Sequence, residues 1–231
     1  MKQIIENIEG RECLIYAGCQ PCALLIQPLG KHERERIDHE VQLIRDTTPI
    51  PFVLCAFTID DWEAELTPWD EPLVSRRGPV PARAEETLHY VCDKLIPLLI
   101  QQYGNKLPIA LGGYSLAGLF SLWAGYERDC FDAVAGISPS VWIRGWKEYM
   151  TMHPICSKAV YLSLGNKEER SRNQTFAQVG SNIRLEHELL SKELGHEHCV
   201  LEWNEGNHFM DNELRTARGL IWCLEKLSKF C

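Results

Sequence analysis

One serine stands in a sequence pattern that suits nucleophilic chemistry. Ser115 lies within Gly113-Tyr114-Ser115-Leu116-Ala117, directly after an apolar run (Pro108–Gly112) and before an apolar helical pattern (Leu116–Tyr126). This is the GxSxG nucleophile elbow with alanine in its last position. The turn is so sharp that the residues two before and two after the serine press against each other, and only very small residues fit there. The pattern predicts that Ser115 is a nucleophile at a strand-to-helix turn.

A serine hydroxyl is a weak nucleophile at neutral pH and needs a neighbouring base. In folds that carry this elbow, the base follows the last strand of the sheet. The last strand-like run, Cys199–Trp203, leads into Asn204–Phe209, which contains His208. The other histidines fall in predicted helices or in loops elsewhere in the chain order: His32, His39, His89, His153, His187, His196 and His198. His208 is therefore the predicted base.

The base in turn needs a carboxylate that holds its tautomer and stabilises its charged form. The chain order serine, acid, histidine places that acid after the run Lys158–Leu164, where Glu168 and Glu169 stand. The segment after Ala133–Ile137 reads Ser138-Pro139-Ser140 and has no carboxylate. We prefer Glu168 as the acid and keep Glu169 as the alternative.

An oxyanion formed during acyl transfer needs two N–H donors. The backbone N–H of Leu116, directly after the nucleophile, is the first. The second is expected in the loop after the strand-like run Cys22–Gln27. Because Pro28 has no N–H, this donor is Leu29 or Gly30.

Short β-branched runs alternate with longer helical patterns along the chain, which is typical of a mostly parallel, doubly wound sheet flanked by helices. The sequence thus predicts a single α/β domain over residues 1–231. The expected strands are Glu12–Ala17, Cys22–Gln27, Phe52–Phe57, Pro108–Gly112, Ala133–Ile137, Lys158–Leu164 and Cys199–Trp203. The expected helices are Ile37–Asp46, Glu85–Tyr103, Leu116–Tyr126, Trp142–Met152, Thr175–Leu194 and Asn212–Phe230.

One long segment, residues 58–84, shows no periodicity and carries four prolines and two tryptophans. A loop of this length inside a compact domain is usually functional. We expect it to lie near the active site and to form one wall of the substrate cleft. The expected substrate-binding side chains are aromatic: Tyr114, Trp62, Trp69, Trp142 and Phe209. At least two of the tryptophans at positions 62, 69, 142 and 146 are expected to belong to the core.

Composition excludes several other classes of function. The formal net charge of −8 argues against nucleic-acid binding, and no apolar run approaches the roughly 20 residues of a membrane span. An acidic residue at position 6 interrupts any signal-peptide pattern, so we expect a cytoplasmic protein whose cysteines are reduced thiols. Cys19 and Cys22 are expected in a turn, and no metal site is predicted; zinc would need further ligands, for which only His196, His198 and Cys199 offer a cluster.

The ordered set of motifs resembles the putative-esterase family of α/β-hydrolases, which includes enterobactin-type siderophore esterases and S-formylglutathione hydrolases. The resemblance spans about Leu24 to His208. Within the family, the sequence is similar to compact bacterial members of unassigned substrate. It implies an α/β-hydrolase fold without a separate lid domain, hydrolysis of a carboxylic ester without a cofactor, and Ser115, Glu168 and His208 as the catalytic triad. The matching segments are Gly112–Gly118, Ser138–Trp142, Gly165 with Glu168, and Gly206–Phe209.

Two features depart from that family. The chain is too short to hold the separate N-terminal domain of some siderophore esterases, and the region after Pro28 lacks the usual acidic or glycine-rich oxyanion loop. The expected function is hydrolysis of a small-molecule ester or thioester through an acyl-enzyme intermediate. An amidase or acyltransferase that uses the same triad is the alternative, and a non-catalytic binding protein of the same fold is a third hypothesis. The sequence names neither the natural substrate nor the oligomeric state.

Overall fold

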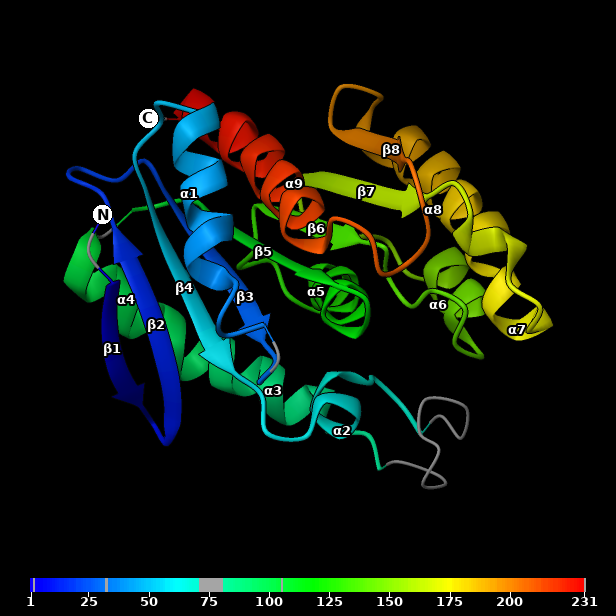
Figure 1. The fold of residues 1–231 in the computed structure, drawn as a ribbon, viewed down its shortest axis with the longest axis horizontal. Helices are drawn as coiled ribbons and strands as arrows, with labels where there is room; N and C mark the ends of the chain where they lie inside the picture. Colours follow the sequence, from blue (N-terminus) through cyan, green and yellow to red (C-terminus); the bar gives the residue numbers. More distant parts are fainter. Residues whose placement is uncertain (2, 32, 71–80, 105, 231) are drawn as a thin grey trace.

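The computed structural model describes residues 1, 3–31, 33–70, 81–104 and 106–230, and contains one eight-stranded sheet (Figure 1). The strand order is β1-β2-β4-β3-β5-β6-β7-β8. Strands β1 and β2, and likewise β2 and β4, pair antiparallel, whereas all the other neighbouring strands are parallel. The strands are β1 (Gln3–Ile8), β2 (Arg11–Ala17), β3 (Ala23–Leu29), β4 (Phe52–Thr58), β5 (Ile109–Tyr114), β6 (Ala133–Ile137), β7 (Ala159–Gly165) and β8 (Cys199–Asn204).

Helices cover both faces of the sheet (Figure 1). The helices α1 (Ile37–Thr47) and α9 (Asn212–Leu227) lie side by side on one face. The helix α5 (Leu116–Glu127), which follows the elbow, packs on β5 and β6 from the opposite face. The remaining helices are α2 (Trp62–Leu66), α3 (Ala84–Tyr90), α4 (Ile96–Tyr103), α6 (Trp146–Met152), α7 (Gln174–Ala177) and α8 (Val179–Leu194).

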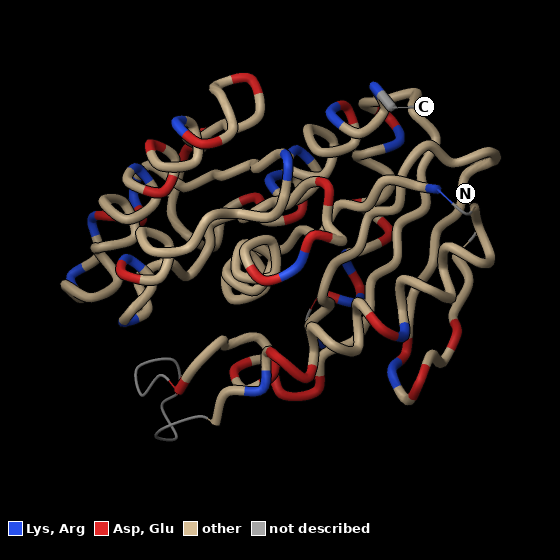
Figure 2. The backbone as a smooth tube through the Cα atoms, turned by 180° about the vertical axis from the view of Figure 1, so that it is seen from behind, with Lys and Arg blue, Asp and Glu red and all other residues tan. Residues whose placement is uncertain are grey.

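The hydrophobic pattern accounts for this layering. The strands β3 to β7 contain no charged residue, and Figure 2 shows the charged residues mainly on helices, loops and edge strands. Each central strand is therefore covered on both sides, as parallel strands require. The buried apolar side chains form two clusters, one on each face of the sheet. Among the described residues, no helix combines the length and apolar character needed to cross a membrane.

The predicted fold is confirmed: a mostly parallel α/β sheet flanked by helices, with each of the seven expected strands present. The prediction missed β1, an edge strand with mixed exposure that lacks a clear alternation. It also missed α2, a helix of only five residues within the segment 58–84 that was expected to be a loop. The predicted helix Trp142–Met152 was too long, because α6 begins only after Gly145, which has a φ of 87°. The turn that holds Cys19 and Cys22 lies between β2 and β3, as expected.

The predicted helix Glu85–Tyr103 is continuous but contains one π-helical turn, Val91–Leu95, between α3 and α4. Pro97 is the second residue after this turn. A proline inside a regular α-helix clashes with the carbonyl four residues earlier and leaves a hydrogen bond unmade. The wider π turn accommodates this local defect within the helix.

The chain passes from β3 through α1 to β4 on one side of β3, and then from β4 through α2 to α4 to β5 on the other side, so the strand order reverses between β3 and β5. Ligands in open α/β sheets bind at this point, outside the carboxyl ends of the strands. The strand β3 ends at Leu29 and β5 ends at Tyr114, so Ser115 lies at that switch point.

Candidate active site

Ser115 lies at the tip of the turn between β5 and α5, with φ 59° and ψ −116°. Non-glycine residues rarely adopt a positive φ, and such strain persists only where the surroundings hold it. A methyl group added to Gly113 would lie 2.6 Å from the Cβ of Ala117, which verifies the steric reason for small residues at both positions. The backbone of Ser115 is fixed on both sides, since its N–H donates to Ile137 O (3.0 Å) and its carbonyl accepts from Ser140 N–H (3.1 Å).

A chain of hydrogen bonds joins three side chains that sequence analysis selected. The Ser115 Oγ lies 3.0 Å from Nε2 of His208, and Nδ1 of His208 lies 2.8 Å from Oε2 of Glu168. An ionised carboxylate only accepts hydrogen bonds, so Nδ1 carries the proton and Nε2 accepts the hydrogen of Ser115. The Ser115 hydroxyl also lies 3.4 Å from the hydroxyl of Ser140.

The loops that carry the acid and the base are bonded to each other. Lys167 N–H donates to Gly206 O (3.0 Å), and Gly206 N–H donates to the side-chain oxygen of Asn166 (3.2 Å). Gly206 has a φ of 102°, and a methyl group on Gly165 would lie 2.6 Å from Gly206 O. The glycines therefore allow the ends of β7 and β8 to approach closely enough for Glu168 to reach His208.

Glu168 is the side chain that faces His208, while Glu169 lies elsewhere. The Glu168 carboxylate is only 5% exposed. Burial by itself raises the pKa of Glu168, but hydrogen bonds and charge from His208, a hydrogen bond from Ser138 and the N–H of Gly165 lower it to about 2. The Glu169 carboxylate instead pairs with Arg184 at 2.7 Å.

Sequence analysis missed two residues of this site. The hydroxyl of Ser138, at the end of β6, donates to Glu168 Oε1 (2.7 Å) and accepts a short hydrogen bond from Arg215. Arg215 itself pairs with the same carboxylate oxygen at 3.0 Å. The sequence signal that could have identified Arg215 is its position in α9, two residues before Ala217 on the buried face of the helix. A charged residue on an apolar face requires a buried partner.

The expected oxyanion donors differ in availability. Leu116 N–H belongs to the first turn of α5, where N–H groups have no acceptor within the helix. The N–H of Gly30, in contrast, donates to the carboxylate of Glu33 (2.9 Å), and Glu33 N–H donates back to Gly30 O (3.0 Å). Leu29 is the last residue of β3, and its side chain is buried. Gly30 N–H is thus occupied in this structure, and the reciprocal bonds fix the turn that carries the next residue, Lys31.

Two hollows meet at Ser115 and His208. The larger, of about 470 Å³, lies toward β6 and β7 and has a mainly apolar lining. Trp142 and Phe176 form its aromatic wall, with ring centroids 4.5 Å apart. Lys167 and Arg170 contribute positive charge to the same lining.

The second hollow, of about 350 Å³, lies toward the ends of β3 and β4. Trp62 at the start of α2 lines it, together with Gly30 and Lys31. Phe209 is 84% exposed and lines both hollows. Tyr114 is buried and touches the second hollow, but its hydroxyl donates to the backbone carbonyl of His208 (2.8 Å). Within the described ranges, no three His, Cys, Asp or Glu side chains form a group that could hold a metal ion.

Trp69 differs from Trp62 although both belong to the long segment 58–84. Its indole N–H donates to Arg144 O (2.7 Å). Its ring stacks on Trp146, with a centroid distance of 6.2 Å, and is tilted against the ring of Tyr149 at 5.5 Å. Trp146 is fully buried, and Trp69 is absent from the described linings of the two hollows. These contacts predict a packing role for Trp69, in place of the expected role in substrate binding. Residues 71–80, including two of the prolines, lie outside the described residues.

Replacing each tryptophan by alanine should separate these roles. We expect Trp62→Ala to change the ratio of kcat/KM between a short and a bulky ester by about tenfold, because a pocket wall is lost. Trp69→Ala should leave that ratio unchanged and reduce the free energy of unfolding by about 3 kcal/mol. Kinetics on two esters and denaturant titration of both variants measure this. An altered ester ratio in Trp69→Ala alone would contradict the assignment.

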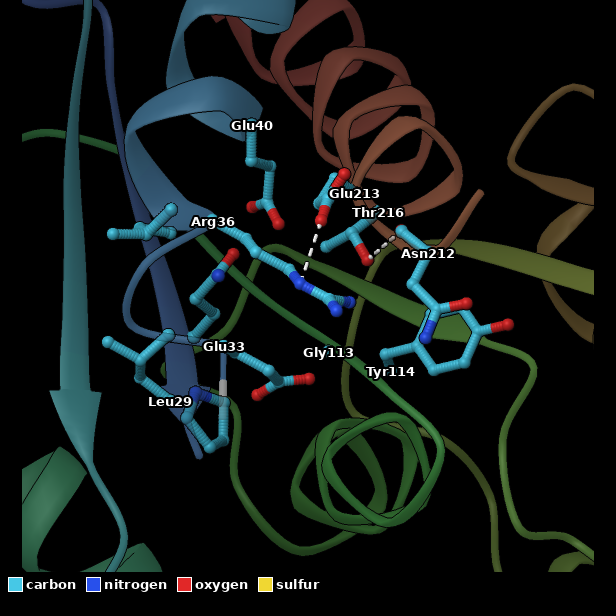
Figure 3. Close-up of a pocket in the computed structure, with 12 residues that line it drawn as sticks. Leu29, Glu33, Arg36, Glu40, Gly113, Tyr114, Asn212, Glu213 and Thr216 are labelled. Carbon is cyan, nitrogen blue, oxygen red and sulfur yellow. Dashed lines mark hydrogen bonds and ion pairs between the residues drawn. The ribbon is translucent and has the colours of Figure 1, made fainter. Parts of the chain in front are cut away.

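A third cavity, of about 30 Å³, lies between α1 and α9, with Tyr114 in its lining (Figure 3). Arg36 pairs with Glu213 across it (3.3 Å), and Glu40 points into it from α1. Burial, with a smaller contribution from Glu33, raises the pKa of Glu40 to about 8, so this carboxyl is largely protonated at neutral pH. A space of this size holds at most a water molecule or two and is too small for a substrate.

Several solved structures share the fold. The IroE-like serine hydrolase from Shewanella oneidensis is 15% identical with a TM-score of 0.76, and the match covers 100% of this chain and 81% of that one. The siderophore hydrolase EstA from Aspergillus nidulans is 16% identical (TM-score 0.73; 98% and 94% covered), and the enterochelin esterase from Shigella flexneri is 18% identical (TM-score 0.69; 98% and 58% covered). At these identities the likeness shows the fold alone. No curated protein matches the chain.

The sequence itself matches a family model. The family described as putative esterase matches residues 32–211, which is more than half of the chain and includes the elbow and His208. The match agrees with the family resemblance that the motifs predicted. The chain belongs to the putative esterase family and is an esterase of the α/β-hydrolase fold.

Proposed function

We propose that the protein hydrolyses a small-molecule carboxylic ester or thioester through an acyl-enzyme intermediate on Ser115. The observation that carries the proposal is the hydrogen-bond chain from Ser115 through His208 to Glu168, with distances of 3.0 and 2.8 Å, at the floor of two hollows. A serine, a base and an oriented acid in this geometry form the arrangement that activates a hydroxyl nucleophile.

The reaction follows from the direction of each hydrogen bond. As Ser115 Oγ attacks the ester carbonyl, its proton passes to Nε2 of His208. Glu168 stabilises the resulting imidazolium, and His208 then gives the proton to the leaving alcohol or thiol. In the second half, His208 takes a proton from water, which attacks the acyl-enzyme. His208 then returns that proton to Ser115 Oγ as the bond to the acyl group breaks, which releases the carboxylic acid and restores the enzyme. The low pKa of Glu168 keeps this carboxylate ionised throughout the reaction. Glu168 therefore accepts a hydrogen bond from His208 and takes up no proton.

The oxyanion is held by Leu116 N–H and a second donor in the loop after β3. Leu29 and Gly30 were the candidates from sequence, but the Gly30 N–H donates to Glu33. Lys31 lines the same hollow as Ser115, and its backbone N–H has no acceptor among the described residues. We therefore assign the second donor to Lys31 N–H.

The two hollows suit the two halves of an ester. Their combined aromatic lining, from Trp62, Trp142 and Phe209, offers apolar contact area on both sides of Ser115. The substrate is therefore a small molecule with an apolar or aromatic part. An acyltransferase or amidase would use the same three residues, and the leaving group or acceptor decides between these reactions. Among the described residues, no cysteine forms a disulfide, which is the state maintained in a cytoplasmic location.

Covalent labelling and a substrate screen test this function. A fluorophosphonate probe should modify the wild-type protein on the peptide that contains Ser115, which mass spectrometry can locate. The screen compares p-nitrophenyl esters of varied acyl length, aryl esters, thioesters and anilides. Turnover of esters or thioesters with little cleavage of anilides supports the proposal. A protein that neither reacts with the probe nor turns over any of these compounds would instead be a binding protein of this fold.

A further inference from the structure

Arg215 is a positive charge in the interior of the protein. It lies in the first turn of α9, seven residues after His208, and its side chain is 1% exposed. Removing a guanidinium from water is costly, and a buried one persists only when well-placed acceptors surround it. Apart from the Ser138 hydroxyl after β6, the acceptors around Arg215 belong to the loops and strand ends that carry the proposed catalytic residues.

One amino group of the guanidinium holds the acid. Arg215 Nη2 donates to Glu168 Oε1 at 3.0 Å and, through a shorter contact, to the hydroxyl of Ser138. The Ser138 hydroxyl must then use its own hydrogen for Glu168 Oε1, which lies 2.7 Å away. Gly165 N–H donates to the same oxygen at 2.8 Å. With Oε1 held by three donors, Oε2 is left to face His208 Nδ1.

The other amino group holds the loop of the base. Arg215 Nη1 donates to the hydroxyl of Tyr114 (2.9 Å) and lies within reach of the carbonyls of Asn207 (3.3 Å) and Met210 (3.4 Å). Because the Tyr114 oxygen accepts from Arg215, its hydrogen is directed to the carbonyl of His208 at 2.8 Å. The residue before the nucleophile is thereby connected to the backbone of the base.

We infer that Arg215 is a positioning residue that keeps the Glu168 carboxylate aligned with His208, and so sets the efficiency of the proton transfers. The inference rests on the proposed function. A purely structural role would predict a loss of stability without a specific loss of turnover. A positioning role predicts a lower kcat with little change in KM, because the substrate hollows do not include Arg215.

The test compares two changes at Arg215 with a control on the same helix. Arg215→Lys keeps the charge but cannot hold both sets of acceptors, and Arg215→Met removes the charge at similar volume. We expect kcat to fall by about 10-fold for Lys and about 100-fold for Met, with KM within about twofold of wild type. Arg218→Met is the control, since Arg218 is half-exposed and pairs with Glu202 (3.2 Å). It should retain wild-type kcat.

A double-mutant cycle decides whether Arg215 acts through Glu168. In a Glu168→Gln background the Arg215→Lys change should lower kcat by less than about threefold, because the carboxylate that it positions is already absent. Equal fold losses in both backgrounds, or a wild-type kcat in Arg215→Lys, would overturn the inference.

Folding and the proposed function are checked separately. Thermal melting identifies variants that do not fold; if both Arg215 variants fail, Ser138→Ala replaces them, since it removes one of the three donors to Oε1 and should lower kcat with KM retained. An unchanged kcat in a folded Ser138→Ala would then overturn the inference. If wild type shows no ester turnover and no probe labelling, the proposed function fails. An active, labelled wild type with insensitive Arg215 variants rejects the positioning role alone.

Discussion

Ser115→Ala should lower kcat for ester hydrolysis by about 10⁶-fold, while the fold and the melting temperature stay close to those of wild type. The Oγ of Ser115 is the atom that would form the acyl-enzyme, and its backbone conformation (φ 59°) is set by the surrounding turn, with the Ser115 N–H bonded to Ile137 O. Alanine in the same conformation removes the nucleophile without changing the packing at Gly113. Initial rates on the best ester of the screen and circular dichroism measure both effects.

Two further variants serve as controls for the prediction on Ser115→Ala. Ser140→Ala removes the hydroxyl that lies 3.4 Å from Ser115 Oγ and should retain probe labelling. The double variant Ser115→Ala, His208→Ala should be no slower than Ser115→Ala alone, because residues of one catalytic unit are not additive. If probe labelling survived in Ser115→Ala but disappeared in Ser140→Ala, Ser140 would be the nucleophile and our assignment of Ser115 would be wrong.

The elements that place these residues could largely be predicted from the sequence. The strands β3 to β7 are short, apolar and uncharged, so their hydrophobic pattern is strong. The elbow at Ser115 carries its own steric signature in Gly113 and Ala117. The edge strand β1 escaped prediction because an exposed strand needs no regular apolar alternation, and its pairing with β2 is a tertiary contact.

The contacts among loops could not be predicted in this way. Arg215 and Ser138 stand 77 residues apart in the chain, and only the folded sheet brings them together. Trp62 and Trp69 lie seven residues apart in the segment 58–84, yet Trp62 lines a hollow and Trp69 stacks on Trp146. Periodicity and motif order give the edge of the sheet at which a side chain lies. They do not give its hydrogen-bond partners, which depend on how neighbouring loops fold over that edge.

Sequence analysis preferred Glu168 as the acid and kept its neighbour Glu169 as the alternative, and the structure places the two side chains in opposite settings. Glu168 is buried with a pKa of about 2, while Glu169 is paired with Arg184 at the surface.

The lowered pKa of Glu168 also makes a prediction for the stability of the protein. A carboxyl whose pKa falls from 4.5 to about 2 on folding stabilises the protein fully above pH 4.5, and this contribution is lost as the pH falls toward 2. In Glu168→Gln, the melting temperature should therefore depend less on pH between about 4.5 and 2 than it does in wild type.

Glu168→Gln should lower kcat by about 10⁴-fold at neutral pH, whereas Glu169→Gln should remain within about twofold of wild type. Glutamine keeps the shape of Glu168 but supplies no negative charge for the His208 imidazolium, and its amide group can donate to Nδ1, which favours the wrong tautomer. Kinetics of both variants on one ester, with melting curves to verify folding, make the comparison, and Glu169→Gln is the matched control. A large loss in Glu169→Gln with a mild one in Glu168→Gln would mean that the acid is the other neighbour and that the hydrogen bond to His208 does not operate in turnover.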